Sequence, residues 1–218
     1  MAVLPDSCAL VRWPRMRLEP STSDLERMSE VTPAAGKAPH DPATSFIAIT
    51  PRLRLRLLTP ADAPYLCRQL NEPSWLQFIG DRGVRTTAAA EQYIRDRIMA
   101  SYDQHGFGMY LVEDRVTAMP MGMCGLVKRD SLPHADLGFS FLPEYWGQGL
   151  AAEAAAAVLR HAVNPLGQQR LLAIATADNE RSGRLLERLG FQFQKLQQLE
   201  PNGETLRVFE CRLRYDAR

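Results

Sequence analysis

The sequence predicts an α/β protein in which a mixed sheet is covered by helices on both faces. Three observations indicate this class. Residues 52–57 alternate with period two and precede helical segments, residues 109–142 hold three strand-like runs, and two later helices alternate with strands. Strands interleaved with helices are typical of a sheet that packs helices on both faces.

The first 45 residues differ from the rest of the 218-residue chain. Six prolines interrupt them, and Ser, Thr and mixed charges fill much of the space between. This composition is typical of a poorly ordered extension, with one short helix expected at residues 23–31. We therefore predict an N-terminal extension at residues 1–45 and one domain at residues 46–218, with Met16 and Met28 as alternative starts.

Charge and cysteine usage exclude several classes of protein. The formal net charge of +1 argues against a general nucleic-acid binder, and no run approaches the roughly 18 apolar residues that a membrane span needs. The four cysteines are scattered without a C-x-x-C pair, which favours reduced thiols and argues against structural zinc. We expect a cytoplasmic protein with no metal, nucleic acid or membrane partner.

The domain begins with a strand and a group of helices. Arginine and leucine alternate along residues 52–57, so the leucines line one face of a half-buried strand. Residues 59–62 read Thr-Pro-Ala-Asp, a helix start, and apolar positions at helical spacing follow up to Leu70. Further helices are expected at residues 74–79 and from Thr86 or Thr87 to Gly106.

The second half of the domain alternates strands and helices. Period-two methionines at 119, 121 and 123 predict one face of a strand. Strands are expected at residues 109–113, 121–128, 136–142, 171–176, 191–199 and 206–213, and helices at residues 150–163 and 182–189.

Two glycines, Gly147 and Gly149, separate the strand at 136–142 from the helix at 150–163. The first N–H groups of a helix have no intrahelical partner and carry partial positive charge, so a phosphate or pyrophosphate binds there when glycines let it approach. The dinucleotide pattern G-x-G-x-x-G fails because Ala152 occupies the third glycine position, and no P-loop lysine follows. A tight turn without a ligand remains the alternative.

The helix at residues 150–163 is rich in alanine and apolar on nearly every side. Such a helix is expected to be buried, and its small side chains allow it to lie close to a sheet.

Residues 143–154, PEYWGQGLAAEA, resemble the acetyl-CoA pyrophosphate loop of the GNAT superfamily of N-acetyltransferases. More narrowly, they resemble the branch that acetylates ribosomal proteins at N-terminal alanine or serine. Residues 179–182, NERS, with the later Leu-Gly-Phe at 189–191, are similar to the N-x-x-S and L-G-F signature of that branch. Residues 52–62 resemble its opening strand and turn, so the likeness covers about residues 47–214. Trp146 replaces the Gln or Arg of the broader superfamily, as in the branch.

The resemblance implies a GNAT-like, mostly antiparallel sheet of six to seven strands. A V-shaped splay would separate the fourth and fifth strands, residues 136–142 and 171–176, and acetyl-CoA would lie in it as a cosubstrate. Arg184 would reach a phosphate, unless it is a solvated surface charge. The other implied contacts are backbone groups of Phe141 and Leu142 and the side chain of Asn179 for the pantetheine arm, and the N–H groups of Gly147, Gln148, Gly149, Leu150, Ala151 and Ala152 for the pyrophosphate.

The implied reaction is direct acetyl transfer to a primary amine, which needs a proton acceptor because amines are largely protonated near pH 7. Ser182 is the expected proton donor to the departing thiolate, although a serine at a helix start also caps N–H groups. Asp136 is the leading candidate for the base. The other candidates for the base are His134, Glu144, Glu200 and Glu204.

The sequence therefore predicts an N-acetyltransferase that acts on a protein N-terminus or on a small-molecule amine, as a monomer or homodimer. A non-catalytic acyl-CoA-binding regulatory module is the alternative, because it keeps the glycine loop and Asn179 but needs neither base nor acid. A nucleotide-binding fold is the third hypothesis.

Overall fold

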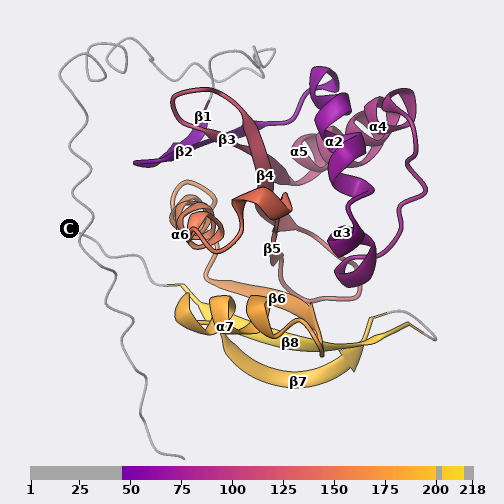
Figure 1. The fold of residues 1–218 in the computed structure, drawn as a ribbon. Coiled ribbons are helices and arrows are strands. Elements are labelled where there is room, and N and C mark those ends of the chain that lie inside the picture. The colour runs from indigo at the N-terminus through magenta and orange to yellow at the C-terminus, as the bar shows by residue number, and fades with distance from the viewer. Residues whose placement is uncertain (1–45, 200–202, 214–218) are drawn as a thin grey trace, which may run out of the picture. The chain divides into compact units, whose positions relative to one another are not determined.

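A computed structural model describes residues 46–199 and 203–213. The predicted extension at residues 1–45, with its helix at 23–31, and Glu200 lie outside these residues. Within the described residues, eight strands form one sheet in the order β1-β2-β3-β4-β5-β6-β8-β7 (Figure 1). The strands are β1 Phe46–Ile49, β2 Leu53–Leu57, β3 Met109–Asp114, β4 Pro120–Val127, β5 Asp136–Phe141, β6 Arg170–Thr176, β7 Gln192–Gln198 and β8 Thr205–Arg212.

The mixed, mostly antiparallel sheet is confirmed, but the expected six to seven strands are fewer than the eight in the described part of the chain. The sequence did not indicate β1, which pairs with β2 at the edge of the sheet. Phe46 and Ile49 at its ends are 38% and 49% exposed. A short edge strand without a buried face leaves no period-two pattern to detect.

Helices cover both faces of the sheet, as predicted. In β3, Tyr110 and Val112 pack in one core cluster with α6 (Leu150–Val163) and α7 (Glu180–Arg188), whereas Leu111 packs with the early helices. Successive strand residues point to opposite faces, so the two sets of helices lie on opposite sides. The early helices are α2 Ala63–Leu70, α3 Pro73–Phe78, α4 Thr87–Tyr93 and α5 Ala100–His105 (Figure 1).

The long early helix has the predicted ends but an irregular middle. Thr86 caps it, since its hydroxyl oxygen accepts a hydrogen bond from the N–H of Ala89 at 3.1 Å. A π-helical segment, Ile94–Met99, joins α4 to α5. Gly106 ends the segment with a left-handed backbone at φ 75°.

The methionine series was wrongly predicted to lie on one face of a strand. Met119 precedes β4 and is 57% exposed. Met121 and Met123 are both buried but belong to different core clusters. The pairing of β3 with β4 skips Met121, so a bulge reverses its direction relative to Met123.

The splay predicted between residues 136–142 and 171–176 lies between β5 and β6. Because β1 precedes the predicted strands, these are the fifth and sixth strands rather than the fourth and fifth. The parallel pairing of β5 with β6 consists of one position, Asp136 opposite Leu172. Beyond it the two strands diverge, and the open edges form a V.

The alanine-rich helix α6 is buried against the sheet, as its composition predicted. Ala154, Ala155 and Ala162 have no exposed surface, and they share one core cluster with residues of β2 to β6 and β8. This helix begins at the glycine loop, so the same core that supports the sheet also supports the loop.

Candidate functional site

The edge of β5 that faces β6 carries free backbone groups. The N–H of Leu142 donates to the carbonyl of Met121 in β4, and the N–H of Leu172 in β6 donates to the carbonyl of Ala135, both within 3.0 Å. Backbone polar groups alternate in direction along a strand, so Phe139 and Phe141 direct theirs toward β6. Since β5 and β6 pair only at Asp136, these groups face the cleft, except that the Phe141 carbonyl accepts a hydrogen bond from Nε1 of Trp146.

Leu142, which the sequence assigned to the same edge, is engaged elsewhere. Besides its N–H bond to Met121, its carbonyl accepts a hydrogen bond from the N–H of Tyr145 at 3.0 Å. Leu142 therefore ends the open edge and begins the loop.

The glycine loop directs backbone N–H groups into the cleft. Gly147 and Gly149 have φ angles of 74° and 76°, a left-handed conformation that side chains rarely tolerate. The first hydrogen bond of α6 joins the N–H of Glu153 to the carbonyl of Gly149 at 3.1 Å. The N–H groups of residues 150–152 thus precede the first intrahelical bond, and these residues line the cleft with Gly147 and Gly149.

A buried carboxylate braces this loop from behind, and the sequence analysis missed its role. Glu153 accepts hydrogen bonds from the Thr50 hydroxyl at 2.6 Å and from the backbone N–H and Nε of Arg52 at 3.0 and 2.7 Å. Arg52 in turn donates from Nη1 to the carbonyl of Gln148 at 2.9 Å. The only sequence signal is a single carboxylate on the first turn of an otherwise apolar helix.

The pKa of Glu153 is lowered. Burial alone raises it, but the hydrogen bonds from Thr50 and Arg52 outweigh burial. The carboxylate is therefore charged and holds Arg52 against the loop.

On the other wall of the V, Asn179 caps α7. Its Oδ1 accepts a hydrogen bond from the N–H of Ser182 at 3.1 Å. The alternative that Ser182 caps this helix is therefore wrong, because Asn179 holds that position. Ser182 is half-buried and lines the cleft. Arg184 is exposed and donates to Glu180 at 2.8 Å, which is the geometry of a surface ion pair.

Two side chains join the walls of the V near the loop. The Nε1 of Trp146 donates to the carbonyl of Phe141 at 2.7 Å. The guanidinium carbon of Arg181 lies 5.5 Å from the centre of the indole ring. Neither side chain was predicted from the sequence to have a function.

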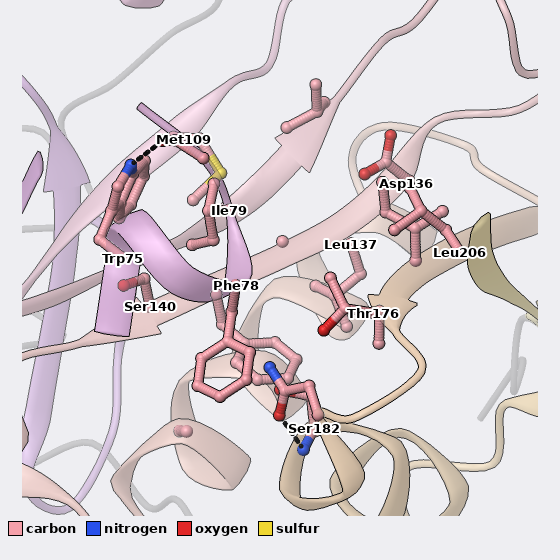
Figure 2. Close-up of a pocket in the computed structure, with 18 of the residues that line it drawn as sticks. Trp75, Phe78, Ile79, Met109, Asp136, Leu137, Ser140, Thr176, Ser182 and Leu206 are labelled. Carbon is pink, nitrogen blue, oxygen red and sulfur yellow. Dashed lines mark hydrogen bonds between the residues drawn. The ribbon is translucent and has the colours of Figure 1, made fainter. Parts of the chain in front are cut away.

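The site is an open cleft of about 2680 Å³. Figure 2 shows Trp75, Phe78 and Ile79 of the α3 region on one side and Thr176 and Leu206 on the other. Ser140 of β5 also lines it. Apolar side chains thus form much of the surface around the strand edge.

A buried hydrogen-bond chain supports Ser140. Gln69, which has no exposed surface, donates from Nε2 to the Ser140 hydroxyl oxygen at 2.7 Å. Its Oε1 accepts from the Tyr65 hydroxyl at 3.1 Å. These bonds tie α2 to the middle of β5.

Asp136 lies at the closed end of the V, where β5 and β6 pair. Asp136 is 1% exposed, and its Oδ1 forms an ion pair with the Nε of Arg129 at 2.9 Å. Burial raises the pKa of Asp136, and the nearby Arg129 and Lys128 offset this only in part. Both Asp136 and Ser182 line the cleft (Figure 2).

The other candidate bases differ in their surroundings. A hydrogen bond from its own backbone N–H, and then its ion pair with Arg68 at 2.7 Å, lower the pKa of the Glu144 carboxyl. His134 is half-buried and does not line the cleft, whereas the exposed Glu204 does. Glu200 is not among the described residues.

Within residues 46–199 and 203–213, no group of three or more His, Cys, Asp and Glu side chains is arranged to hold a metal ion. No helix in the same residues is long and apolar enough to cross a membrane. Cys124 is fully buried, and burial raises the pKa of its thiol, so it packs as a small apolar side chain.

A splayed α/β sheet with a glycine loop at the mouth of its V is the arrangement that the motifs predicted for a GNAT acyltransferase. Residues 52–192 match the family model described as Acetyltransferase (GNAT) domain. The match covers more than half of the chain, so this protein belongs to the GNAT acetyltransferase family and is an N-acetyltransferase enzyme. The family prediction is confirmed.

Similar proteins agree with this membership. The uncharacterized N-acetyltransferase YoaA of Bacillus subtilis is 28% identical over 144 residues, which cover 66% of this chain and 81% of YoaA. A putative GNAT-family acetyltransferase structure from Bordetella pertussis is 27% identical, with a TM-score of 0.63, over 76% of this chain and 98% of the other.

Ribosomal-protein acetyltransferases are also among the structural neighbours. RimL, a ribosomal L7/L12 alpha-N-protein acetyltransferase in complex with coenzyme A, has a TM-score of 0.67 with 18% identity. The likeness covers 78% of this chain and 98% of RimL, and at this identity it concerns the fold.

Proposed function

We propose that this enzyme transfers an acetyl group from acetyl-CoA directly to a primary amine. The observation that carries the proposal is the alignment of two sets of free donors. The open edge of β5 at Phe139 and Phe141 leads to the N–H groups of residues 150–152. An extended amide-bearing arm that ends in a pyrophosphate has the matching chemistry.

Hydrogen bonds along β5 would hold the pantetheine arm as a strand is held at a sheet edge. The N–H groups of Phe139 and Phe141 and the carbonyl of Phe139 would face the arm, since the Phe141 carbonyl is bonded to Trp146, and Asn179 approaches from α7. The pyrophosphate would bind at Gly147 to Ala152. Leu142 contributes by ending the strand, since its own polar groups are engaged.

The chemistry requires two proton transfers. The amine nitrogen attacks the thioester carbonyl carbon, the C–S bond breaks, and the acetyl group becomes an amide. The proton lost by the amine goes to a base, and the departing thiolate receives one from a donor. We assign the base to Asp136, acting through water because its carboxylate is buried, and the donor to Ser182.

The acceptor is a primary amine on a protein N-terminus or on a small molecule. The cleft is open and largely apolar beside Trp75, Phe78 and Ile79, which suits an amine carried on an extended chain. The resemblance to the ribosomal-protein branch makes peptide N-termini with alanine or serine the first acceptors to test.

The proposal is tested by thiol release from acetyl-CoA across a panel of peptide N-termini, polyamines and aminoglycosides. Turnover on at least one amine is expected. Tight CoA binding without turnover on any amine would instead favour the non-catalytic acyl-CoA module.

Two variants separate binding from chemistry. Gly149→Val should abolish CoA binding, because its φ of 76° strains any side chain at the phosphate-binding turn. Ser182→Ala should lower kcat by about 10²-fold while the Kd for CoA stays nearly unchanged. An unchanged kcat would remove Ser182 from the mechanism.

A further inference from the structure

Trp146 and Arg181 meet across the V from opposite walls. Trp146 belongs to the loop that follows β5, and Arg181 to the first turn of α7, which follows β6. The bond from Nε1 to the Phe141 carbonyl holds the indole in one orientation. The guanidinium lies over the ring at 5.5 Å, so one side chain positions the other.

The charge of Arg181 lacks a carboxylate partner in the part of the chain that the structure describes. Arg184, one turn further on, is neutralised by Glu180 at 2.8 Å. Arg68 is likewise paired, with Glu144, which precedes the glycine loop. An unpaired cation thus lines the same cleft as the positive N-terminus of α6. An anion between the two would be attracted by both.

The contact with the indole leaves the N–H groups of Arg181 able to bind that anion. A cation over an aromatic ring is held by the ring's π-electrons, and this contact uses none of the guanidinium's hydrogen-bonding capacity. The planar guanidinium can present two N–H groups to two phosphate oxygens. The contact also restricts the long side chain in advance, so less conformational entropy is lost when the phosphate binds.

We propose that Arg181, held by Trp146, binds a phosphate of the CoA nucleotide at the mouth of the V. This inference rests on the proposed function, because it names the cation that recognises the same cosubstrate. The phosphate contact that the sequence predicted for Arg184 is thus assigned to Arg181, because the guanidinium of Arg184 is engaged with Glu180.

Calorimetric titration of purified full-length variants tests the proposal. Arg181→Gln should weaken CoA binding about tenfold, which corresponds to about 1.4 kcal/mol. Arg184→Gln is the matched control, since it removes the same charge from the same helix, and its Kd should stay within about twofold. Pantetheine, which lacks the nucleotide phosphates, should bind wild type and Arg181→Gln equally.

Dephospho-CoA, which lacks the 3′-phosphate, shows whether Arg181 binds the pyrophosphate or the 3′-phosphate of CoA. An equal loss for CoA and dephospho-CoA assigns Arg181 to the pyrophosphate, whereas a loss for CoA alone assigns it to the 3′-phosphate. An Arg181→Gln Kd within twofold of wild type for both ligands would overturn the proposal, as would an equal loss in Arg184→Gln.

Trp146→Phe tests the positioning. It keeps a ring beneath Arg181 but removes the hydrogen bond to Phe141, so its loss of CoA affinity should be smaller than that of Arg181→Gln. Trp146→Leu should approach the full loss. Full affinity in Trp146→Leu would overturn the role of the indole. Failure of wild type to bind CoA would instead reject the proposed function, and this inference with it.

Discussion

Asp136 shows how a residue's surroundings change its chemistry. In the sequence it is a carboxylate at the start of a strand, with no sign of burial. In the structure it is 1% exposed and lies at the one position where β5 and β6 pair. Burial favours the neutral acid and raises the pKa, and Arg129 at 2.9 Å offsets this only in part. A carboxylate of this kind accepts a proton more readily than an exposed one.

We predict that Asp136 sets the acid limb of the pH–rate profile. Because its pKa is raised, the carboxyl loses its proton, and becomes able to act as a base, only at a pH above the ordinary aspartate value of 3.8. The fall in kcat/KM on acidification should therefore occur above pH 3.8. Asp136→Asn should lower kcat/KM by about 10²–10⁴-fold and remove this limb.

The measurement is kcat/KM against pH for both proteins on the same amine. Asp130→Asn is a suitable control, since it changes a nearby aspartate that is exposed in the turn before β5. If the acid limb persists in Asp136→Asn, the base is another group. Glu204 is then a candidate, because it lines the cleft.

At the scale of elements, the phosphate loop depends on contacts from a distant segment. Thr50 and Arg52 precede β2, yet they hold Glu153 on α6, and Arg52 also holds the Gln148 carbonyl. The glycines make the loop conformation accessible, but this brace selects it. The loop and the start of β2 therefore form one structural unit.

We predict that Glu153→Gln destabilises the protein and weakens CoA binding. The variant replaces charge-assisted hydrogen bonds, each worth about 1.5–3 kcal/mol when buried, by weaker neutral ones. A loss of about 1–3 kcal/mol in the free energy of unfolding follows. Glu91→Gln is the control, because it alters an exposed ion pair with Arg95 that contributes about 0–1 kcal/mol.

The pH dependence of stability provides a second measure. The pKa of Glu153 is lower in the folded state, so the stabilisation it provides is fully present above the unfolded value of 4.5. It is lost as the pH falls through the lowered folded value. Denaturant titrations should therefore show a smaller loss of stability on acidification in Glu153→Gln. Equal behaviour of the Glu153 and Glu91 variants would contradict the brace.

On the scale of the whole molecule, one core joins two halves of a nearly divided sheet. β5 and β6 share a single paired position. One cluster of buried side chains nevertheless includes residues of β2 to β5, of α6 and of β6 and β8. The V is open at its edges and closed beneath by packing, so the cleft is maintained without strand pairing.

We predict that enlarging α6 disturbs this shared core. Ala155→Leu adds bulk at a position without exposed surface, which should cost about 1–3 kcal/mol of stability. Ala156→Leu is the matched control, because Ala156 is half-buried on the same helix and helix propensity changes little. Thermal unfolding of both variants checks this. An equal Tm for Ala155→Leu and Ala156→Leu would contradict close packing between α6 and the sheet.

Local patterns predicted most of the elements. The alternation in residues 52–57, the cap at Thr86 and the stop at Gly106 were all read correctly, because each depends on neighbours along the chain. The edge strand β1 and the bulge at Met121 were missed, because pairing partners distant in sequence decide them. Ser182 was predicted from its motif as the proton donor, and this role stays a prediction; its alternative as a cap was excluded only by the bond between Asn179 and its N–H.

Short contiguous segments were sufficient to predict the family, the glycine loop and most of the strands and helices, because each of these depends on neighbours along the chain. The burial of Asp136, the brace from Arg52 to Glu153 and the contact of Arg181 with Trp146 could not be predicted in this way. In each case the two partners lie on separate elements, and their meeting depends on how the elements pack. Propensity and spacing act within a segment, whereas charge, burial and stacking at the cleft arise between segments.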